Sequence, residues 1–180
     1  IKQPNRNLLL WRDKTVDGLK TGHTEEAGYC LVASAVRDGM RLIAVVFGTN
    51  SEQARAAETQ KLLTYGFRFF ETRTFYQKGV ELAQQQVWKG EQDKVKAGLA
   101  EDLTLTLQRG QLDKLQASMS FADTLIAPIA QGQVIGKVEV KQGEQVLHTS
   151  DLIALEAVEE GGLFRRLWDS IRLFFFSLFN

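Results

Sequence analysis

Three consecutive residues near the start of the chain have the types and spacing needed to hold a substrate beside a strand. Lys20 brings a fixed positive charge, Thr21 brings a hydroxyl that can hydrogen-bond a carboxylate, and Gly22 has no side chain. A strand with glycine at this position lets a peptide backbone lie against it as an added strand. Taken alone, such a tripeptide is more often a surface lysine beside a glycine turn, so its meaning depends on the elements around it.

The elements around the tripeptide are expected to place it in an edge strand of a small sheet. Residues 16–19 predict a turn that leads into this strand, and two apolar stretches, 28–36 and 40–47, follow it. The sequence Arg-Asp-Gly at 37–39 separates the two stretches and is a turn signal, so we expect a β-hairpin.

A helix is expected after the hairpin. Ser51 can accept hydrogen bonds from the N–H groups of a first helical turn and would act as the N-cap. The residues that follow predict a helix packed on the sheet, because five of them fall roughly on one helical face. These five residues are Ala54, Ala57, Leu62, Tyr65 and Phe69.

The region from about residue 71 to 159 has a different pattern, in which apolar residues alternate with polar ones. The alternation is clear at 103–107, at 115–121 and at 137–141, and glycines punctuate these runs. Short, evenly spaced strands with glycine turns predict a small antiparallel β-sandwich or barrel.

The segment after Gly161 and Gly162 predicts a helix with a wide apolar face and arginines opposite. Periodicity alone favours a helix packed on the β-rich region, but the aromatic face better suits a helix lying in a membrane surface. Its arginines would then pair with anionic lipid headgroups. The longest uninterrupted apolar run, 173–176, is far shorter than the ~20 residues of a membrane-spanning helix. An arc of about 160° holds the apolar face, namely Leu163, Phe164, Leu167, Trp168, Ile171, Phe174, Phe175, Leu178 and Phe179.

The overall composition excludes several classes of function. Lys and Arg number 22 and Asp and Glu number 22, so no basic surplus indicates a nucleic-acid partner. The single cysteine, Cys30, rules out an internal disulfide and is expected to be a buried small hydrophobe. His23 and His148 are too isolated to predict a zinc site, so we expect no metal and no other cofactor.

Several stretches along nearly the whole chain follow the pattern of one enzyme family. They are residues 4–11, 16–24, 27–29, 41–43, 61–63, 65–71, 87–90 and 106–110. With these stretches the chain closely resembles the D-alanyl-D-alanine carboxypeptidases, which are low-molecular-mass penicillin-binding proteins. Its Lys-Thr-Gly resembles one of the motifs shared by penicillin-binding proteins and β-lactamases.

The resemblance implies a fold class and three parts of the chain. Residues 1–70 would be an α/β catalytic-domain remnant, made of an antiparallel sheet edge plus a helix. Residues 71–160 would be an all-β, sandwich-like domain, and residues 161–180 an amphipathic membrane-anchor helix.

The resemblance also implies an activity and a role for each residue of the motif. The family removes the terminal D-alanine from peptidoglycan pentapeptide through an acyl-serine intermediate, and β-lactam antibiotics acylate the same serine. Lys20 would bind the substrate carboxylate and help relay a proton, and Thr21 beside Gly22 would bond the same carboxylate. The backbone N–H of His23 would join the oxyanion hole. Arg6 would hold the terminal carboxylate with its guanidinium fork.

The implied location is the periplasm, where the C-terminal helix would hold the protein on the lipids of the outer face of the inner membrane. The chain departs from the family in one respect: no serine is followed three residues later by lysine, and no Ser-x-Asn occurs. In the family both motifs lie upstream of the region matched here. We therefore expect a C-terminal portion that cannot form an acyl-enzyme by itself.

Two other interpretations stay open at this point. One is a non-catalytic envelope-binding β-module on a membrane anchor. The other is a β-lactamase, although the β-rich region and the amphipathic tail count against it. The sequence upstream of residue 1 would discriminate between the enzyme and the module, because only the enzyme needs the two missing motifs.

Overall fold

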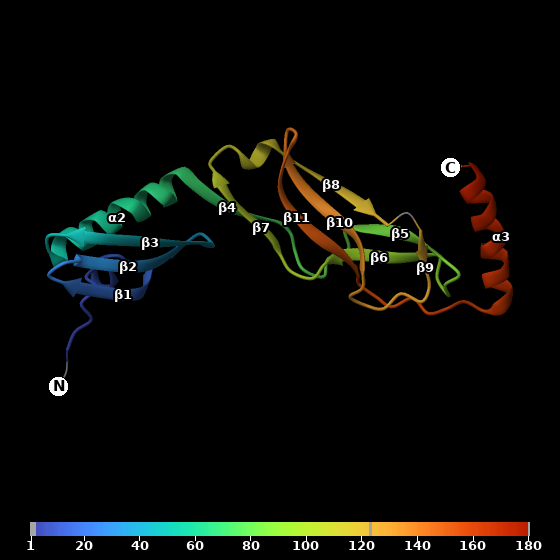
Figure 1. The fold of residues 1–180 in the computed structure, drawn as a ribbon, viewed down its shortest axis with the longest axis horizontal. Helices are drawn as coiled ribbons and strands as arrows, with labels where there is room; N and C mark the ends of the chain where they lie inside the picture. The colour runs from blue at the N-terminus through green and yellow to red at the C-terminus, as the bar shows by residue number, and fades with distance from the viewer. Residues whose placement is uncertain (1–2, 123, 180) are drawn as a thin grey trace. The chain divides into compact units, whose positions relative to one another are not determined.

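A three-stranded antiparallel sheet carries the tripeptide. The computed structural model describes residues 3–122 and 124–179, and its first elements are α1 (Leu9–Arg12), β1 (Val16–Thr24), β2 (Gly28–Arg37) and β3 (Met40–Thr49). The strands pair in the order β1-β2-β3 (Figure 1). The predicted hairpin is confirmed, since Arg37 of β2 pairs with Met40 of β3 around Asp38 and Gly39. Both turn residues have positive φ, which a tight reversal of this kind favours.

The turn predicted over residues 16–19 is wrong, because Asp17 lies inside strand β1. The chain reverses at residues 25–27 instead, between β1 and β2. Asp17 accepts hydrogen bonds from Arg41 of β3, with a shortest distance of 2.8 Å, and this interaction lowers the pKa of the Asp17 carboxyl. An Asp-Gly pair therefore marks an irregularity here, which lies between Val16 and Gly18 where the register with β2 shifts.

Helix α2 (Glu52–Phe69) covers one face of this sheet (Figure 1). Ser51 is its N-cap, as predicted, and the Ser51 Oγ accepts a hydrogen bond from the Ala54 N–H at 3.0 Å. The predicted apolar face is wrong: Leu62, Tyr65 and Phe69 are exposed. Apolar residues occur all around the C-terminal half of the helix, so periodicity alone could not select the buried side. The buried residues are Arg55, Ala56, Thr59, Leu63 and Phe67.

A two-stranded ribbon, β4 (Phe70–Tyr76) with β7 (Leu103–Gln108), follows α2. Arg109, directly after β7, closes the C-terminal end of α2. Its backbone N–H donates to the carbonyl of Phe69 at 2.9 Å, and its guanidinium donates to the carbonyls of Arg68 and Phe67 at 3.0 and 3.2 Å. These bonds satisfy helix carbonyls that otherwise have no partner within a helix. The first compact unit accordingly consists of the residues up to Arg73 together with Thr106–Leu112.

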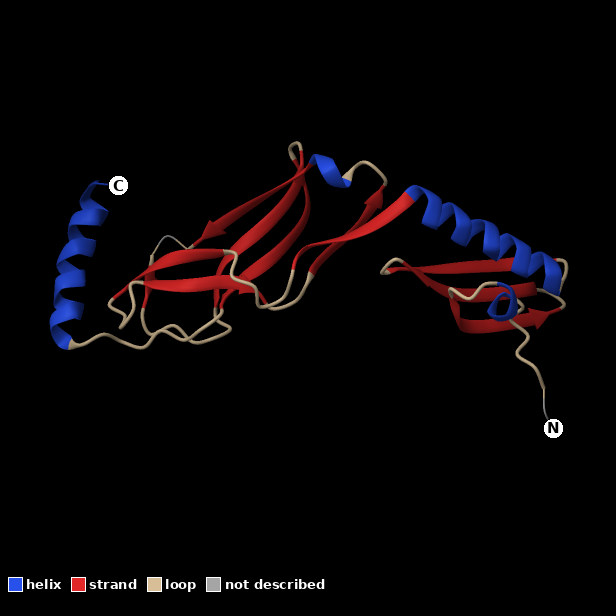
Figure 2. Cartoon of the chain, turned by 180° about the vertical axis from the view of Figure 1, so that it is seen from behind, coloured by secondary structure: helices blue, strands red, loops and turns tan. Residues whose placement is uncertain are grey.

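The second compact unit, Thr74–Leu105 with the residues from Asp113 onward, is built on a six-stranded sheet (Figure 2). The strand order is β8-β10-β11-β6-β5-β9. Its remaining elements are β5 (Ala83–Trp88), β6 (Lys94–Leu99), the short 3-10 helix η1 (Leu112–Lys114), β8 (Leu115–Phe121), β9 (Leu125–Ile126), β10 (Val134–Gln142) and β11 (Gln145–Ala154). The expected β-rich region with alternating strands is therefore present.

The second unit departs from a purely antiparallel sheet in one place. β5 and β9 pair parallel, with Val87 opposite Leu125 and Trp88 opposite Ile126. A two-residue strand that ends near a proline leaves too short a pattern for sequence reasoning to detect. The other pairs are antiparallel, and they bury two apolar clusters that include Val95 and Val138.

The predicted C-terminal helix is confirmed as α3 (Leu163–Phe179), which follows the loop after β11 (Figure 2). No helix among the described residues is long and apolar enough to span a membrane. The side chain of Leu178, one of the predicted anchor residues, lies outside the described part of the chain. The apolar side chains that α3 exposes are Leu163, Phe164, Leu167, Trp168, Ile171, Phe174 and Phe175.

Asp13 ties three elements of the first unit together and should make its stability depend on pH. Burial acts to raise the Asp13 pKa, but hydrogen bonds from Thr15 and Gln60 and the charge of Arg37 outweigh it and lower the pKa from 3.8 to about 2. A lowered pKa contributes stability that is present above pH 4 and is lost as the pH falls towards 2. We expect the free energy of unfolding of the first unit to fall by about 2 kcal/mol over this interval.

The measurement is urea unfolding between pH 5 and pH 2, with Asp13→Asn as the comparison. The variant should be less stable at pH 5 and should show a smaller loss on acidification. A variant whose profile runs parallel to that of the unchanged chain would contradict the role given to Asp13.

Candidate functional site

The tripeptide lies in an edge strand with one side open. In β1, Lys20, Thr21 and Gly22 stand opposite Val32, Leu31 and Cys30 of β2. Among the described residues no strand pairs with the other edge of β1. The backbone of this strand therefore has the geometry needed to accept an added peptide strand.

The predicted site residues come together around one open cavity of about 600 Å³. Arg6 reaches it from the segment before α1, and Lys20, Thr21, Gly22 and His23 reach it from β1. The remaining lining residues are Tyr29, Glu52 and Arg55.

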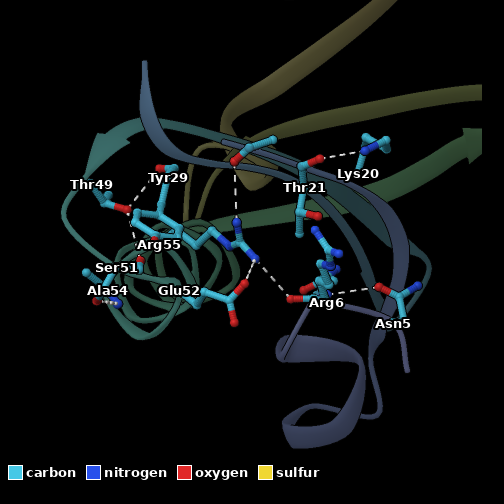
Figure 3. Close-up of polar contacts among 12 residues, drawn as sticks. Asn5, Arg6, Lys20, Thr21, Tyr29, Thr49, Ser51, Glu52, Ala54 and Arg55 are labelled. Carbon is cyan, nitrogen blue, oxygen red and sulfur yellow. Dashed lines mark hydrogen bonds and ion pairs between the residues drawn. The ribbon is translucent and has the colours of Figure 1, made fainter. Parts of the chain in front are cut away.

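Sequence reasoning missed three residues that line this cavity, and Arg55 is the one that is buried. Its side chain lies in the first turn of α2 and is only 3% exposed. The guanidinium donates to the carbonyls of Gly22 at 3.3 Å and Arg6 at 3.2 Å, and it pairs with Glu52 at 3.1 Å (Figure 3). One buried cation thus holds the motif strand and the Arg6 segment together. The sequence signal for this residue was the spacing of Glu52 and Arg55, which lie three residues apart just after the Ser51 cap and can form an ion pair.

Asn7 holds the same segment from the other side. It is buried, and its side chain donates to the carbonyl of Gly18 at 3.2 Å and accepts from the Leu9 N–H at 3.1 Å. With Arg55 and Asn7 on either side of it, the backbone of Arg6 is fixed, while the side chain of Arg6 stays exposed at the cavity.

The polar groups of the motif are accessible from the cavity. Lys20 is exposed, and its Nζ donates to the carbonyl of Thr21 at 2.6 Å (Figure 3). The ring of His23 stacks on Tyr29 with centroids 4.0 Å apart, and the guanidinium of Arg55 lies 5.6 Å from the centroid of the same tyrosine. The aromatic contacts fix the end of the strand on which His23 lies.

Packing within this chain does not require glycine at position 22. A Cβ there would lie 3.7 Å from the Cβ of Cys30, which is an ordinary contact, and the φ of Gly22 is not positive. Cys30 itself is half-buried rather than buried as expected. The lack of a side chain at Gly22 therefore favours a ligand backbone that lies against the open strand.

The charges around the cavity are predominantly positive. Arg6, Lys20 and Arg55 supply three cations, and the one carboxylate among the lining residues, Glu52, is paired with Arg55. Such a site favours an anionic group, and a carboxylate matches the guanidinium and hydroxyl donors present. Among the described residues, no group of three or more His, Cys, Asp or Glu side chains is arranged to hold a metal ion.

Removing the Arg55 side chain should loosen the site without unfolding the second unit. Arg55→Ala removes charged hydrogen bonds to two carbonyls, and we expect the first unit to lose about 1.5–3 kcal/mol of unfolding free energy. Hydrogen exchange of the amides of β1 and of residues 5–7 should accelerate. Gln53→Ala, an exposed change in the same helical turn, is the matched control. Equal hydrogen-exchange rates in the two variants would refute the role of Arg55 in holding β1 and the Arg6 segment together.

Comparisons with known proteins agree on one family. Residues 70–160 match the family model described as penicillin-binding protein 5, C-terminal domain, and residues 1–51 match the one described as D-alanyl-D-alanine carboxypeptidase. The chain is 45% identical to the D-alanyl-D-alanine carboxypeptidase DacC of Escherichia coli K12 over 182 residues, covering 100% of this chain and 46% of that protein.

Two further relatives support the same match. The D-alanyl-D-alanine carboxypeptidase DacA of Escherichia coli K12 is 42% identical over 182 residues, which cover 100% of this chain and 45% of that protein. A crystal structure of penicillin binding protein 5 from Haemophilus influenzae superposes with a TM-score of 0.79 at 42% identity, covering 89% of this chain and 47% of that one. The chain thus spans about half the length of the curated relatives it matches.

Proposed function

Because the chain belongs to the D-alanyl-D-alanine carboxypeptidase family, we propose that its first unit forms one wall of the active site of a peptidoglycan D-alanyl-D-alanine carboxypeptidase. The observation that carries the proposal is the cavity shared by Arg6, Lys20, Thr21, Gly22 and His23. Its excess of positive charge suits the terminal carboxylate of a D-alanyl-D-alanine peptide.

Each residue of this wall has a proposed task in the reaction. Lys20 and Thr21 bind the substrate carboxylate, and the fork of Arg6 holds it in a fixed orientation. The peptide backbone lies along the open edge of β1, where Gly22 leaves room for it. The backbone N–H of His23 then faces the scissile carbonyl and stabilises the negative charge that develops on its oxygen.

The acyl-serine intermediate requires a nucleophile that these residues do not supply. Since no serine of the chain is followed three residues later by lysine, we propose that the serine and its base come from the remainder of a longer protein. The terminal D-alanine leaves when that serine attacks, and water then releases the shortened peptide. β-Lactam antibiotics acylate the same serine, with their carboxylate held by the same cations.

The second unit and α3 have a proposed role outside the chemistry. The apolar face that α3 exposes is wide and aromatic, which supports a helix lying in a lipid surface. We place the protein in the periplasm, with α3 on the outer face of the inner membrane. A purely non-catalytic β-module is not favoured, because it gives no reason for a cationic cavity at the open strand of the first unit.

The test uses the full-length protein that contains these residues, compared with the 180-residue chain. The full-length protein should release D-alanine from a pentapeptide and should form a stoichiometric penicilloyl adduct visible by mass spectrometry. The 180-residue chain should do neither. The proposal fails if the full-length protein shows no D-alanine release, or if the 180 residues alone acquire the adduct.

A further inference from the structure

Helix α3 contacts its own unit through its polar side. Asp169, the only acidic residue of the helix, is 8% exposed, and its Oδ2 accepts a hydrogen bond from the Lys89 N–H at 2.7 Å. Lys89 has a φ of 61°, which is uncommon for a residue other than glycine. This conformation directs its N–H to Asp169, while its carbonyl accepts from the Gly161 N–H at 2.8 Å.

The arginines of α3 are also engaged by the second unit. Arg165 pairs with Asp93, and Arg166 pairs with Glu160 at 2.6 Å. The guanidinium of Arg172 lies 5.6 Å from the centroid of the Trp88 ring. The arginines were expected to pair with lipid headgroups. In the structure each of the three already has a contact within the protein.

The start of the helix is fixed as well. Glu160 forms a bridge with Gly90, and the Glu91 N–H donates to the carbonyl of Glu159 at 2.8 Å. A Cβ at Gly161 would lie 2.8 Å from the carbonyl oxygen of Gly90, so the two backbones approach more closely than a side chain allows. The segment that leads into α3 therefore follows the turn after β5 and leaves the helix little freedom to swing.

We propose that Asp169 and the arginines dock α3 on the second unit with its apolar face outward before any lipid is met. The inference rests on the proposed anchor and specifies how it recognises its partner. With the cations held by Asp93, Glu160 and Trp88, the helix binds the hydrocarbon boundary of a lipid surface and does not require anionic headgroups. Asp169 is a positioning residue, because a buried carboxylate with a charge-assisted hydrogen bond holds better than exposed ion pairs.

The first experiment compares two lipid surfaces. The full 180-residue chain is mixed with vesicles of phosphatidylcholine alone or of phosphatidylcholine with phosphatidylglycerol, and the bound fraction is measured by flotation. We expect partition coefficients within about twofold of each other. Binding that is more than about tenfold stronger to the anionic vesicles would overturn the inference and leave the anchor standing. Absence of binding to both would overturn the anchor and, with it, the inference.

The second experiment removes the contact between Asp169 and the Lys89 N–H. Asp169→Ala should remove the protection of the Lys89 amide against hydrogen exchange. It should also make binding favour anionic vesicles, because a helix that is no longer fixed at Lys89 can move its arginines away from Asp93, Glu160 and Trp88. Asp169→Asn keeps an oxygen acceptor, so its amide protection and its lipid preference should lie between those of the unchanged chain and those of Asp169→Ala. Circular dichroism confirms that the sheet remains folded in each variant. An Asp169→Ala protein in which the Lys89 amide stays protected contradicts the proposed contact.

Discussion

Replacing Lys20 by alanine in the full-length protein should lower the rate of acylation by penicillin about tenfold to a hundredfold. The side chain is exposed, and the hydrogen bond that it forms in the described part of the chain goes to the neighbouring carbonyl of Thr21. Folding should therefore change little. The proposed partner of its ammonium is the carboxylate of the substrate, and losing a charge-assisted hydrogen bond there removes about 1.5–3 kcal/mol of stabilisation.

The measurement is the second-order rate constant for penicillin acylation, taken together with the melting temperature. Lys61→Ala provides the control, because Lys61 is an exposed lysine of α2 in an ion pair with Glu58, away from the cavity. Lys20→Arg should retain part of the rate, since it keeps the charge but changes the geometry of the donor. An acylation rate for Lys20→Ala equal to that for Lys61→Ala would refute the assignment.

Deleting residues 163–180 should lower the binding of the protein to vesicles by about a hundredfold or more. Among its described residues, the helix exposes seven large apolar side chains that a lipid surface can bury. The second unit keeps its own sheet and clusters without the helix, so the deletion should leave it folded. Flotation with and without the segment measures the effect.

A point substitution separates the anchor from general hydrophobicity. Phe164 on α3 is 91% exposed and Phe47 on β3 is 71% exposed, so the two are matched in type and accessibility. Phe164→Ser should weaken vesicle binding several-fold, since part of a phenylalanine is worth roughly 1 kcal/mol when buried. Phe47→Ser should not. Equal effects of the two changes would show that binding does not depend on α3.

Patterns within one element were predictable from the sequence. The hairpin at residues 37–40, the Ser51 cap and helix α3 depend on neighbouring residues only, and each is present. The motif residues and Arg6 could be selected by resemblance, and they do line one cavity.

Features that depend on contacts distant in sequence were not predictable. The buried face of α2 is set by what β2 and β3 present to it, and apolar residues on both sides of the helix left the periodicity undecided. Arg55 could not be selected from the sequence, because its partners, the carbonyls of Gly22 and Arg6, are 33 and 49 residues away. Asp169 likewise finds its donor, Lys89, at a separation of 80 residues.

The Arg109 closure of α2 has a consequence for how the chain can be rearranged. The backbone passes between the two units at residues 73–74, 105–106 and 112–113, so they are not sequential modules. A protein truncated after Arg73 would lack Arg109 and leave the terminal carbonyls of α2 without their donors. When the second unit is exchanged between relatives, residues 106–112 should therefore remain those of the recipient, because they belong to the first unit.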